Sequence, residues 1–190
     1  MRFKVKILSV AIVAGLFCNT LAAAEDGFVG RVSLGFINIK EETSNGGSSS
    51  ASSNDGGGIV EIYGGYRMQN LQFGLSYAVT SFIYEVYGQK DYIGATGNQI
   101  LASGAFVFED MHDKIKPFLG LGLGWFTFKL DGDTSHESGI IGAAIGGVNV
   151  EFDNLFFGIE VRERLFGGAD ANSYEVRPQD TYMAFIGYKF

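Results

Sequence analysis

The chain ends in the stretch TYMAFIGYKF, Thr181–Phe190. As an extended strand, this stretch would divide its side chains between two faces. Successive side chains of an extended strand point to opposite faces. One face would carry Tyr182, Ala184, Ile186, Tyr188 and Phe190, and the other Met183, Phe185, Gly187 and Lys189. The last residues of most domains are poorly ordered unless they are tied down. A bulky apolar residue at the very end therefore indicates that this strand pairs with another strand.

Seven earlier runs show the same period of two, which predicts a half-buried strand in each case. They are Phe28–Lys40, Ile59–Met68, Leu71–Phe82, Gly97–Phe108, Pro117–Lys129, Gly139–Phe152 and Leu155–Phe166. Aromatic residues reach 14% and only two prolines occur, a composition that favours strands. With Thr181–Phe190, the pattern predicts an all-β chain of eight strands.

The gaps between these runs alternate in length. The long gaps are Glu41–Gly58, Ile83–Thr96, Leu130–Ser138 and Gly167–Asp180, and the shorter ones are Gln69-Asn70, Glu109–Lys116 and Asp153-Asn154. An up-and-down meander places all long gaps at one end, as outer-membrane barrels do with their outside loops. The first long gap contains NGGSSSASSNDGGG, which we interpret as a spacer rather than a binding epitope.

Alternation alone does not say which face points outward, because a soluble lipocalin-like barrel buries its apolar face and a membrane barrel exposes it. The opposite face is rich in glycine, which suits the narrow interior of a small barrel. These glycines are Gly74, Gly120, Gly122, Gly124, Gly158 and Gly187. Runs of about ten residues also match a tilted crossing of a bilayer. We therefore predict an eight-stranded antiparallel up-and-down transmembrane β-barrel, closed by pairing of its last strand with its first because lipid tolerates no open sheet edge.

The N-terminus has the pattern of a secretory signal peptide. Arg2, Lys4 and Lys6 precede an apolar stretch, Ile7–Phe17, that is too short to span a bilayer. Ala22-Ala23-Ala24 then predicts cleavage before Glu25. Residues 1–24 would be removed, together with the only cysteine, and residues 25–190 would form the barrel domain. Of 14 basic residues 11 would remain against 21 acidic ones, a net charge of −10 that argues against a nucleic-acid partner.

Two motifs resemble those of a known family. Gly187-Tyr188-Lys189-Phe190 resembles the C-terminal signature of bacterial outer-membrane barrels, and KPFLGLGLG, at 116–124, is similar to the K-P-[FY]-x-G-x-G-x-G strand of small barrels. Residues 25–190 resemble the small eight-stranded porin-like family, related in shape to the transmembrane domain of outer-membrane protein A and to the opacity-type antigens. The resemblance implies that Gly187, Tyr188 and Phe190 are an assembly signal read by the barrel-assembly machinery. It implies an architecture and no particular activity.

Eight charged residues within the predicted strands fall on the face opposite the large apolar residues. They are Arg31, Glu61, Arg67, Glu151, Glu160, Arg162, Arg164 and Lys189. A lipid-facing Arg or Lys at mid-depth costs about 2–4 kcal/mol, so we predict that these residues point into the lumen. We interpret them as a salt-bridge network that fills the barrel, with a narrow ion path or gate as the alternative.

Catalytic and metal motifs are weak. Ser135-His136-Glu137 are adjacent in a predicted loop, which holds side chains poorly for catalysis. His112 falls in a predicted turn, and the Ser, His and Glu of lipid A deacylase barrels lie on strands instead. Asp131 and Asp133 lack the remaining ligands of a calcium loop. We therefore expect no catalytic residue, no cofactor and no metal site.

The predicted function is that of a small, monomeric, integral outer-membrane surface protein with an envelope-structural role. Exposed loops would contact host molecules, and lipid and lipopolysaccharide would surround the barrel. Six aromatic residues fit belts at the membrane interfaces: Trp125, Tyr63, Tyr66, Tyr77, Tyr182 and Tyr188. The alternatives are a narrow porin-like channel, a barrel for a small hydrophobic ligand, or a lipid A-modifying enzyme.

Overall fold

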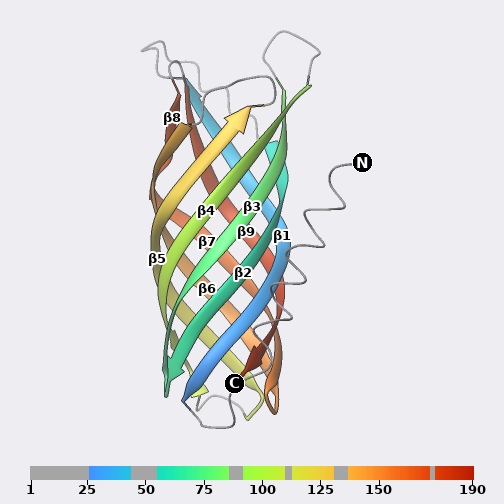
Figure 1. The fold of residues 1–190 in the computed structure, drawn as a ribbon, viewed down its shortest axis with the longest axis vertical. Helices are drawn as coiled ribbons and strands as arrows, with labels where there is room; N and C mark the ends of the chain where they lie inside the picture. The colour runs from blue at the N-terminus through green and yellow to red at the C-terminus, as the bar shows by residue number, and fades with distance from the viewer. Residues whose placement is uncertain (1–25, 44–54, 86–91, 110–112, 131–136, 172–173) are drawn as a thin grey trace.

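The computed structural model describes residues 26–43, 55–85, 92–109, 113–130, 137–171 and 174–190, which form one closed antiparallel barrel (Figure 1). Its strands are β1 Gly27–Thr43, β2 Asp55–Met68, β3 Leu71–Glu85, β4 Tyr92–Val107, β5 Ile115–Leu130, β6 Glu137–Phe152, β7 Leu155–Gly167, β8 Ala169–Ala171 and β9 Tyr174–Lys189. Eight of them build the wall, and the three-residue β8 pairs with β9. This confirms the predicted eight-stranded barrel. No helix in the described ranges is long and apolar enough to cross a membrane.

The barrel closes between its first and last strands. β1 pairs with β9 from Val29 opposite Lys189 to Ile37 opposite Thr181, and β9 pairs with β7 on its other side. The final residue, Phe190, donates its backbone N–H to the carbonyl of Phe28 at 2.8 Å. The pairing of β1 with β9, called the seam below, therefore includes the chain end that the sequence pattern predicted to be paired.

Strand ends differ between the two ends of the barrel. At the lower end in Figure 1, Gln69-Asn70 and Asp153-Asn154 form the predicted two-residue turns, with a left-handed backbone at Gln69 (φ 50°) and Asp153 (φ 53°). At the other end the strands run further than predicted. The predicted loop at 167–180 in fact contains β8 and the first part of β9. Strands that extend past the lipid need only backbone partners, so no apolar alternation marked them in the sequence.

The outer wall carries a continuous apolar belt. Along β5 the outward residues Leu119, Leu121 and Leu123 are 62%, 63% and 56% exposed, and Ile159 on β7 is 62% exposed. Other strands contribute Phe28, Leu34, Phe36, Phe73, Leu75, Ile100, Tyr182, Ile186 and Tyr188, all exposed. A water-soluble monomer does not expose an apolar surface of this extent. The faces are therefore those of a membrane barrel, and the lipocalin-like alternative is wrong.

Five of the six predicted belt aromatics, Tyr63 being the exception, are exposed on this wall, namely Trp125, Tyr66, Tyr77, Tyr182 and Tyr188. The prediction for Tyr63 is wrong, since this residue is buried in the lumen. Its ring occupies the space next to Gly74 on β3, and the guanidinium carbon of Arg31 lies 4.6 Å from the ring centre. Tyr63 follows Glu61 by two residues and so shares its inward face.

Candidate functional site

The centre of the lumen holds four buried charges from three strands. Arg162 on β7 donates two hydrogen bonds to Glu61 on β2, from Nη1 to Oε2 at 2.6 Å and from Nη2 to Oε1 at 2.7 Å. Its Nε donates to Glu160 at 2.6 Å. Arg31 on β1 reaches Glu160 at 2.7 Å and Glu61 at 3.5 Å. This central quartet is electrically balanced, and each residue is at most 8% exposed.

The stability of the central quartet depends on the presence of all four charged residues. Both carboxylates are shared between two guanidinium groups, and Arg162 binds Glu61 in the bidentate geometry that makes Arg–carboxylate pairs strong. Removing one partner of a buried ion pair leaves an uncompensated charge, whereas the complete pair adds little net stability. The arrangement therefore holds β1, β2 and β7 together across the lumen.

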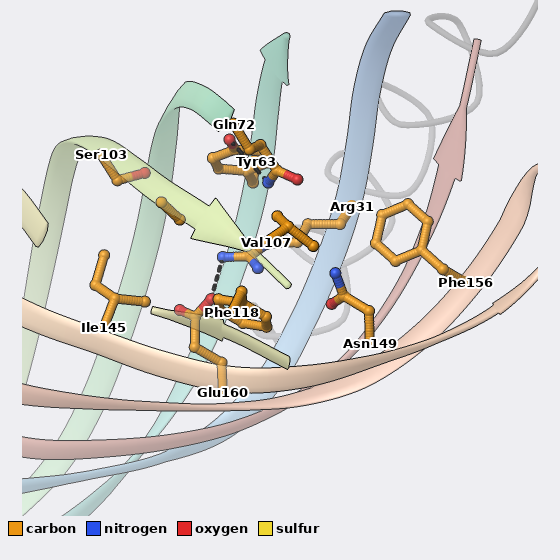
Figure 2. Close-up of a pocket in the computed structure, with 11 residues that line it drawn as sticks. Arg31, Tyr63, Gln72, Ser103, Val107, Phe118, Ile145, Asn149, Phe156 and Glu160 are labelled. Atoms are coloured by element: carbon orange, nitrogen blue, oxygen red, sulfur yellow. Dashed lines mark hydrogen bonds and ion pairs between the residues drawn. The ribbon is translucent and has the colours of Figure 1, made fainter. Parts of the chain in front are cut away.

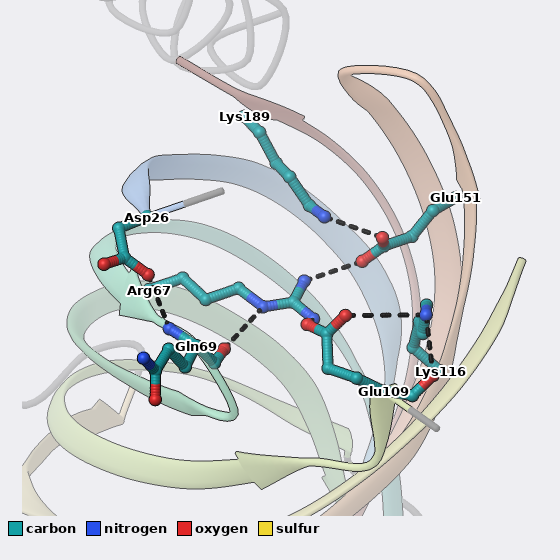
Figure 3. Close-up of polar contacts among 7 residues, drawn as sticks. All are labelled: Asp26, Arg67, Gln69, Glu109, Lys116, Glu151 and Lys189. Carbon is teal, nitrogen blue, oxygen red and sulfur yellow. Dashed lines mark hydrogen bonds and ion pairs between the residues drawn. The ribbon is translucent and has the colours of Figure 1, made fainter. Parts of the chain in front are cut away.

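A second charged group closes the lower end of the lumen (Figure 3). Arg67 on β2 contacts Glu109 in the connection between β4 and β5, and donates to Glu151 on β6 at 2.7 Å. Lys189 on β9 pairs with Glu151 at 2.6 Å. Lys116 on β5 donates to the backbone carbonyl of Glu109 at 2.8 Å and lies 3.5 Å from its carboxylate. This lower cluster links four strands and one turn.

The lower cluster is also tied to the chain entering the barrel. Arg67 donates through Nε to the carbonyl of Gln69 at 3.4 Å, and the backbone N–H of Gln69 donates to Asp26 at 2.7 Å. Figure 3 shows Arg67 reaching across the opening toward Glu151. The side chains of the lower cluster thus cover the mouth at the end where the short turns lie.

Toward the opposite end of β5, large apolar side chains fill much of the lumen. Phe126 and Phe128 are buried, with ring centres 6.4 Å apart, and Ile37 and Ile141 belong to the same core. Lys116 begins β5 beside the lower cluster, so Phe126 and Phe128 lie about ten residues further along that strand. Thr80 and Gln99 are buried in the same part of the lumen: Gln99 is paired with Phe126, and the Thr80 hydroxyl and the Phe126 ring both border Gly97. These packed side chains fill the lumen at this level.

A small cavity borders the central quartet (Figure 2). Arg31 and Glu160 of the quartet line it together with Phe118, Asn149 and Phe156. Its volume is about 20 Å³, where one ordered water needs roughly 10–15 Å³. Typical small-molecule pockets measure about 300–1,000 Å³, so this cavity has room for water and no room for a hydrophobic ligand.

The structure places the eight predicted lumenal charges in three groups. Arg31, Glu61, Glu160 and Arg162 form the central quartet; Arg67, Glu151 and Lys189 join the lower cluster. Arg164 donates to the backbone carbonyl of Gly167 near the end of β7. Glu109 and Lys116 were missed, because both were assigned to a connection. The K-P start of the β5 motif was the available signal for Lys116.

The residues of the assembly signal occupy both faces of β9. Tyr188 points outward and Gly187 inward, and the rings of Tyr188 and Phe190 meet edge to face with centres 5.1 Å apart. The weak catalytic and calcium candidates His112, Asp131, Asp133, Ser135 and His136 lie outside the described residues. Within the described ranges no group of three His, Cys, Asp or Glu residues is arranged to hold a metal ion.

Comparison with solved structures identifies similar folds. Neisserial surface protein A shares 21% identity, with 90% of this chain and 100% of that chain covered and a TM-score of 0.62. The outer membrane protein OprG from Pseudomonas aeruginosa shares 16% identity over 87% of this chain and 95% of its own, with a TM-score of 0.58. Comparison of the sequence with protein-family models and with curated proteins gives no match. The likeness confirms the fold of small outer-membrane barrels and supports the predicted outer-membrane location.

Proposed function

We propose that this protein is a closed outer-membrane barrel that displays its long connections at the cell surface and carries no substrate through its lumen. The main support is the filled lumen, which is occupied by the central quartet, the lower cluster and a core of buried apolar side chains that runs along it. The connection between β1 and β2, residues 44–54, lies at the end opposite the two-residue turns at 69–70 and 153–154, which provides a second support.

Within this proposal the barrel is a rigid support and the long connections are the working parts. Binding residues are often carried on loops that a rigid scaffold positions. Contacts with host surface molecules, with neighbouring lipopolysaccharide, and a contribution to envelope integrity belong to this proposed role. Neither catalysis nor a cofactor is part of it.

Epitope labelling tests the proposed display. An epitope inserted between Ser48 and Ser49 should be labelled by its antibody on intact cells, because that segment joins the upper ends of β1 and β2. The same epitope between Asp113 and Lys114, at the opposite end, should be labelled only after the outer membrane is permeabilised. Labelling in the reverse order would contradict the proposed orientation.

If display serves adhesion, removal of residues 45–53 should abolish host-cell binding while the cold, unboiled protein still migrates as a folded barrel.

Planar-bilayer recording tests the proposed closure. The purified barrel should show no steady open level above that of a protein-free membrane, because buried side chains fill the lumen at the lower cluster, at the central quartet and around Phe126 and Phe128. The Glu163→Gln variant, altered on the outer wall, is the matched control and should behave identically. A steady conductance that disappears when Arg162 and Glu160 are neutralised would instead favour the narrow-channel alternative.

A further inference from the structure

We propose that two reciprocal phenylalanine–glycine contacts between β7 and β9 set the register in which the last strand closes the barrel. This inference concerns how the wall is completed, and it is independent of the proposed surface role.

The connection nearest to β9 does not by itself set this register. A two-residue turn fixes how its strands align, as Gln69-Asn70 does for β2 and β3 and Asp153-Asn154 for β6 and β7. Two residues, 172–173, likewise connect β8 to β9, but the alignment changes before β7 is reached. Ala169 lies opposite Val176, whereas the alignment of β7 with β9, with Glu163 opposite Asp180, would place Ala169 opposite Tyr174. Gly167, with a φ of 90°, lies between the two alignments. The other neighbour of β9 is β1, at the far end of the sequence. No connection therefore carries its alignment directly to the pairing of β7 with β9, and the side chains of these strands are left to select it.

Lipid-facing side chains are poor at selecting the alignment. A shift of β9 by one residue would turn its apolar face into the lumen. A shift by two residues would keep that face outward. It would then lie against the outer faces of β1 and β7, which are apolar along most of their length. The outward residues are Phe28, Val32, Leu34 and Phe36 on β1, Phe157, Ile159 and Val161 on β7, and Tyr182, Ala184, Ile186 and Tyr188 on β9. Burial in lipid thus excludes a shift of β9 by an odd number of residues. It hardly distinguishes the native alignment from one shifted by two residues.

The lumenal faces of β7 and β9 fit together in one alignment. Phe156 is paired with Gly187, and Gly158 with Phe185. A Cβ on Gly187 would lie 2.7 Å or less from three atoms of the Phe156 ring, and a Cβ on Gly158 would overlap the Phe185 ring in the same way. Each ring therefore occupies the space that the opposite glycine leaves empty. The two rings meet edge to face with centres 6.1 Å apart.

Further contacts depend on the same alignment. Arg31 of the central quartet lies 4.8 Å above the Phe185 ring, and Lys189 pairs with Glu151 at 2.6 Å. A two-residue shift in one direction would place Phe156 opposite Phe185, so that two rings compete for one space. A shift in the other direction would place Gly158 opposite Gly187 and leave both rings without a glycine. Close-packed interiors tolerate neither overlap nor voids well.

Cysteine pairs on the outer face can report the alignment, because residues 25–190 contain no cysteine. Val32 and Ile186 are paired across the seam, and directly opposed Cα atoms about 4.5–5.5 Å apart are within disulfide range. Val32→Cys with Ile186→Cys reports the native register. Val32→Cys with Ala184→Cys, or with Tyr188→Cys, reports a shift of two residues in either direction.

Gly187→Phe should lower the native cross-link by about ten-fold or more, the effect of roughly 1–3 kcal/mol of overpacking. Phe156→Gly combined with Gly187→Phe exchanges ring and glycine, and it should restore the native cross-link even if the single variant does not fold. Gly64→Phe is the matched control, since a Cβ on Gly64 meets no atom within 4 Å. It should cross-link as the parent does.

Two results would overturn the proposal. In one, Gly187→Phe closes in the native register as efficiently as the parent protein. In the other, the exchange variant closes no better than the single variant, which would mean that the ring and glycine do not act as a pair. Cross-linking is measured after folding into lipid vesicles, and boiled and unboiled migration reports the folded fraction of each variant.

Discussion

Replacing Arg162 with alanine is expected to destabilise the folded barrel by about 3–5 kcal/mol, the cost of leaving a buried ion partner uncompensated. Arg162 makes three charge-assisted hydrogen bonds, two to Glu61 and one to Glu160. Without it, two carboxylates that are 0% and 1% exposed share only Arg31. The measurement is urea unfolding in lipid vesicles, followed by the fluorescence of Trp125, the chain's single tryptophan.

Two variants sharpen this experiment. Glu163→Gln changes the next residue, which points to the outer wall, and it should leave the unfolding curve within about 0.5 kcal/mol of the parent. Arg162→Met with Glu61→Met removes both members of the bidentate pair, and it should cost less than Arg162→Ala because a fully apolar replacement leaves fewer unpaired charges. An Arg162→Ala protein as stable as the parent would contradict the assigned role of the central quartet.

Leu121→Arg is expected to cost about 2–4 kcal/mol of folding free energy in a bilayer, the penalty for arginine on the lipid face near mid-depth. Leu121 is 63% exposed and lies midway along the outward residues of β5. Thr127→Arg, further along the same strand toward the loop end, should cost only about 0–1 kcal/mol, as expected near an interface. The same unfolding assay measures both variants.

The comparison of Leu121 with Thr127 tests the direction of the apolar face. In a soluble barrel an exposed Leu121 would tolerate arginine, and the two variants would behave alike. Equal stability of both variants would therefore contradict the membrane assignment. A depth-dependent penalty is specific to a wall surrounded by lipid.

Alternation in the sequence was sufficient to predict which side chains face inward, and Arg31, Glu61 and Arg162 lie in the lumen for that reason. It was insufficient for Tyr63, because amphipathic rings suit both an interface and a packed interior. The ends of β4 and β9 were also underestimated. Their outer portions are held by backbone pairing with neighbouring strands, which leaves no periodic signal in the side chains.

Partners within the lumen could not be predicted from the sequence. Arg162 and Glu61 are 101 residues apart along the chain, and Arg67 and Glu151 are 84 apart. Which inward residues meet depends on the stagger of strands around the closed wall. A strand pattern fixes the face of a residue and says nothing of its height relative to a strand on the far side.

By itself the sequence determined the strand number, the inward and outward faces, the closure of the sheet and the two-residue turns at 69–70 and 153–154. These follow from a period of two, from the spacing of turns and from the intolerance of lipid for unpaired backbone. Tertiary structure alone decided the grouping of charges into the central quartet and lower cluster, and the seating of Phe156 and Phe185 on opposite glycines. The physical reason is that a face is a local property of one strand, whereas a contact across the lumen exists only after the strands are staggered and closed.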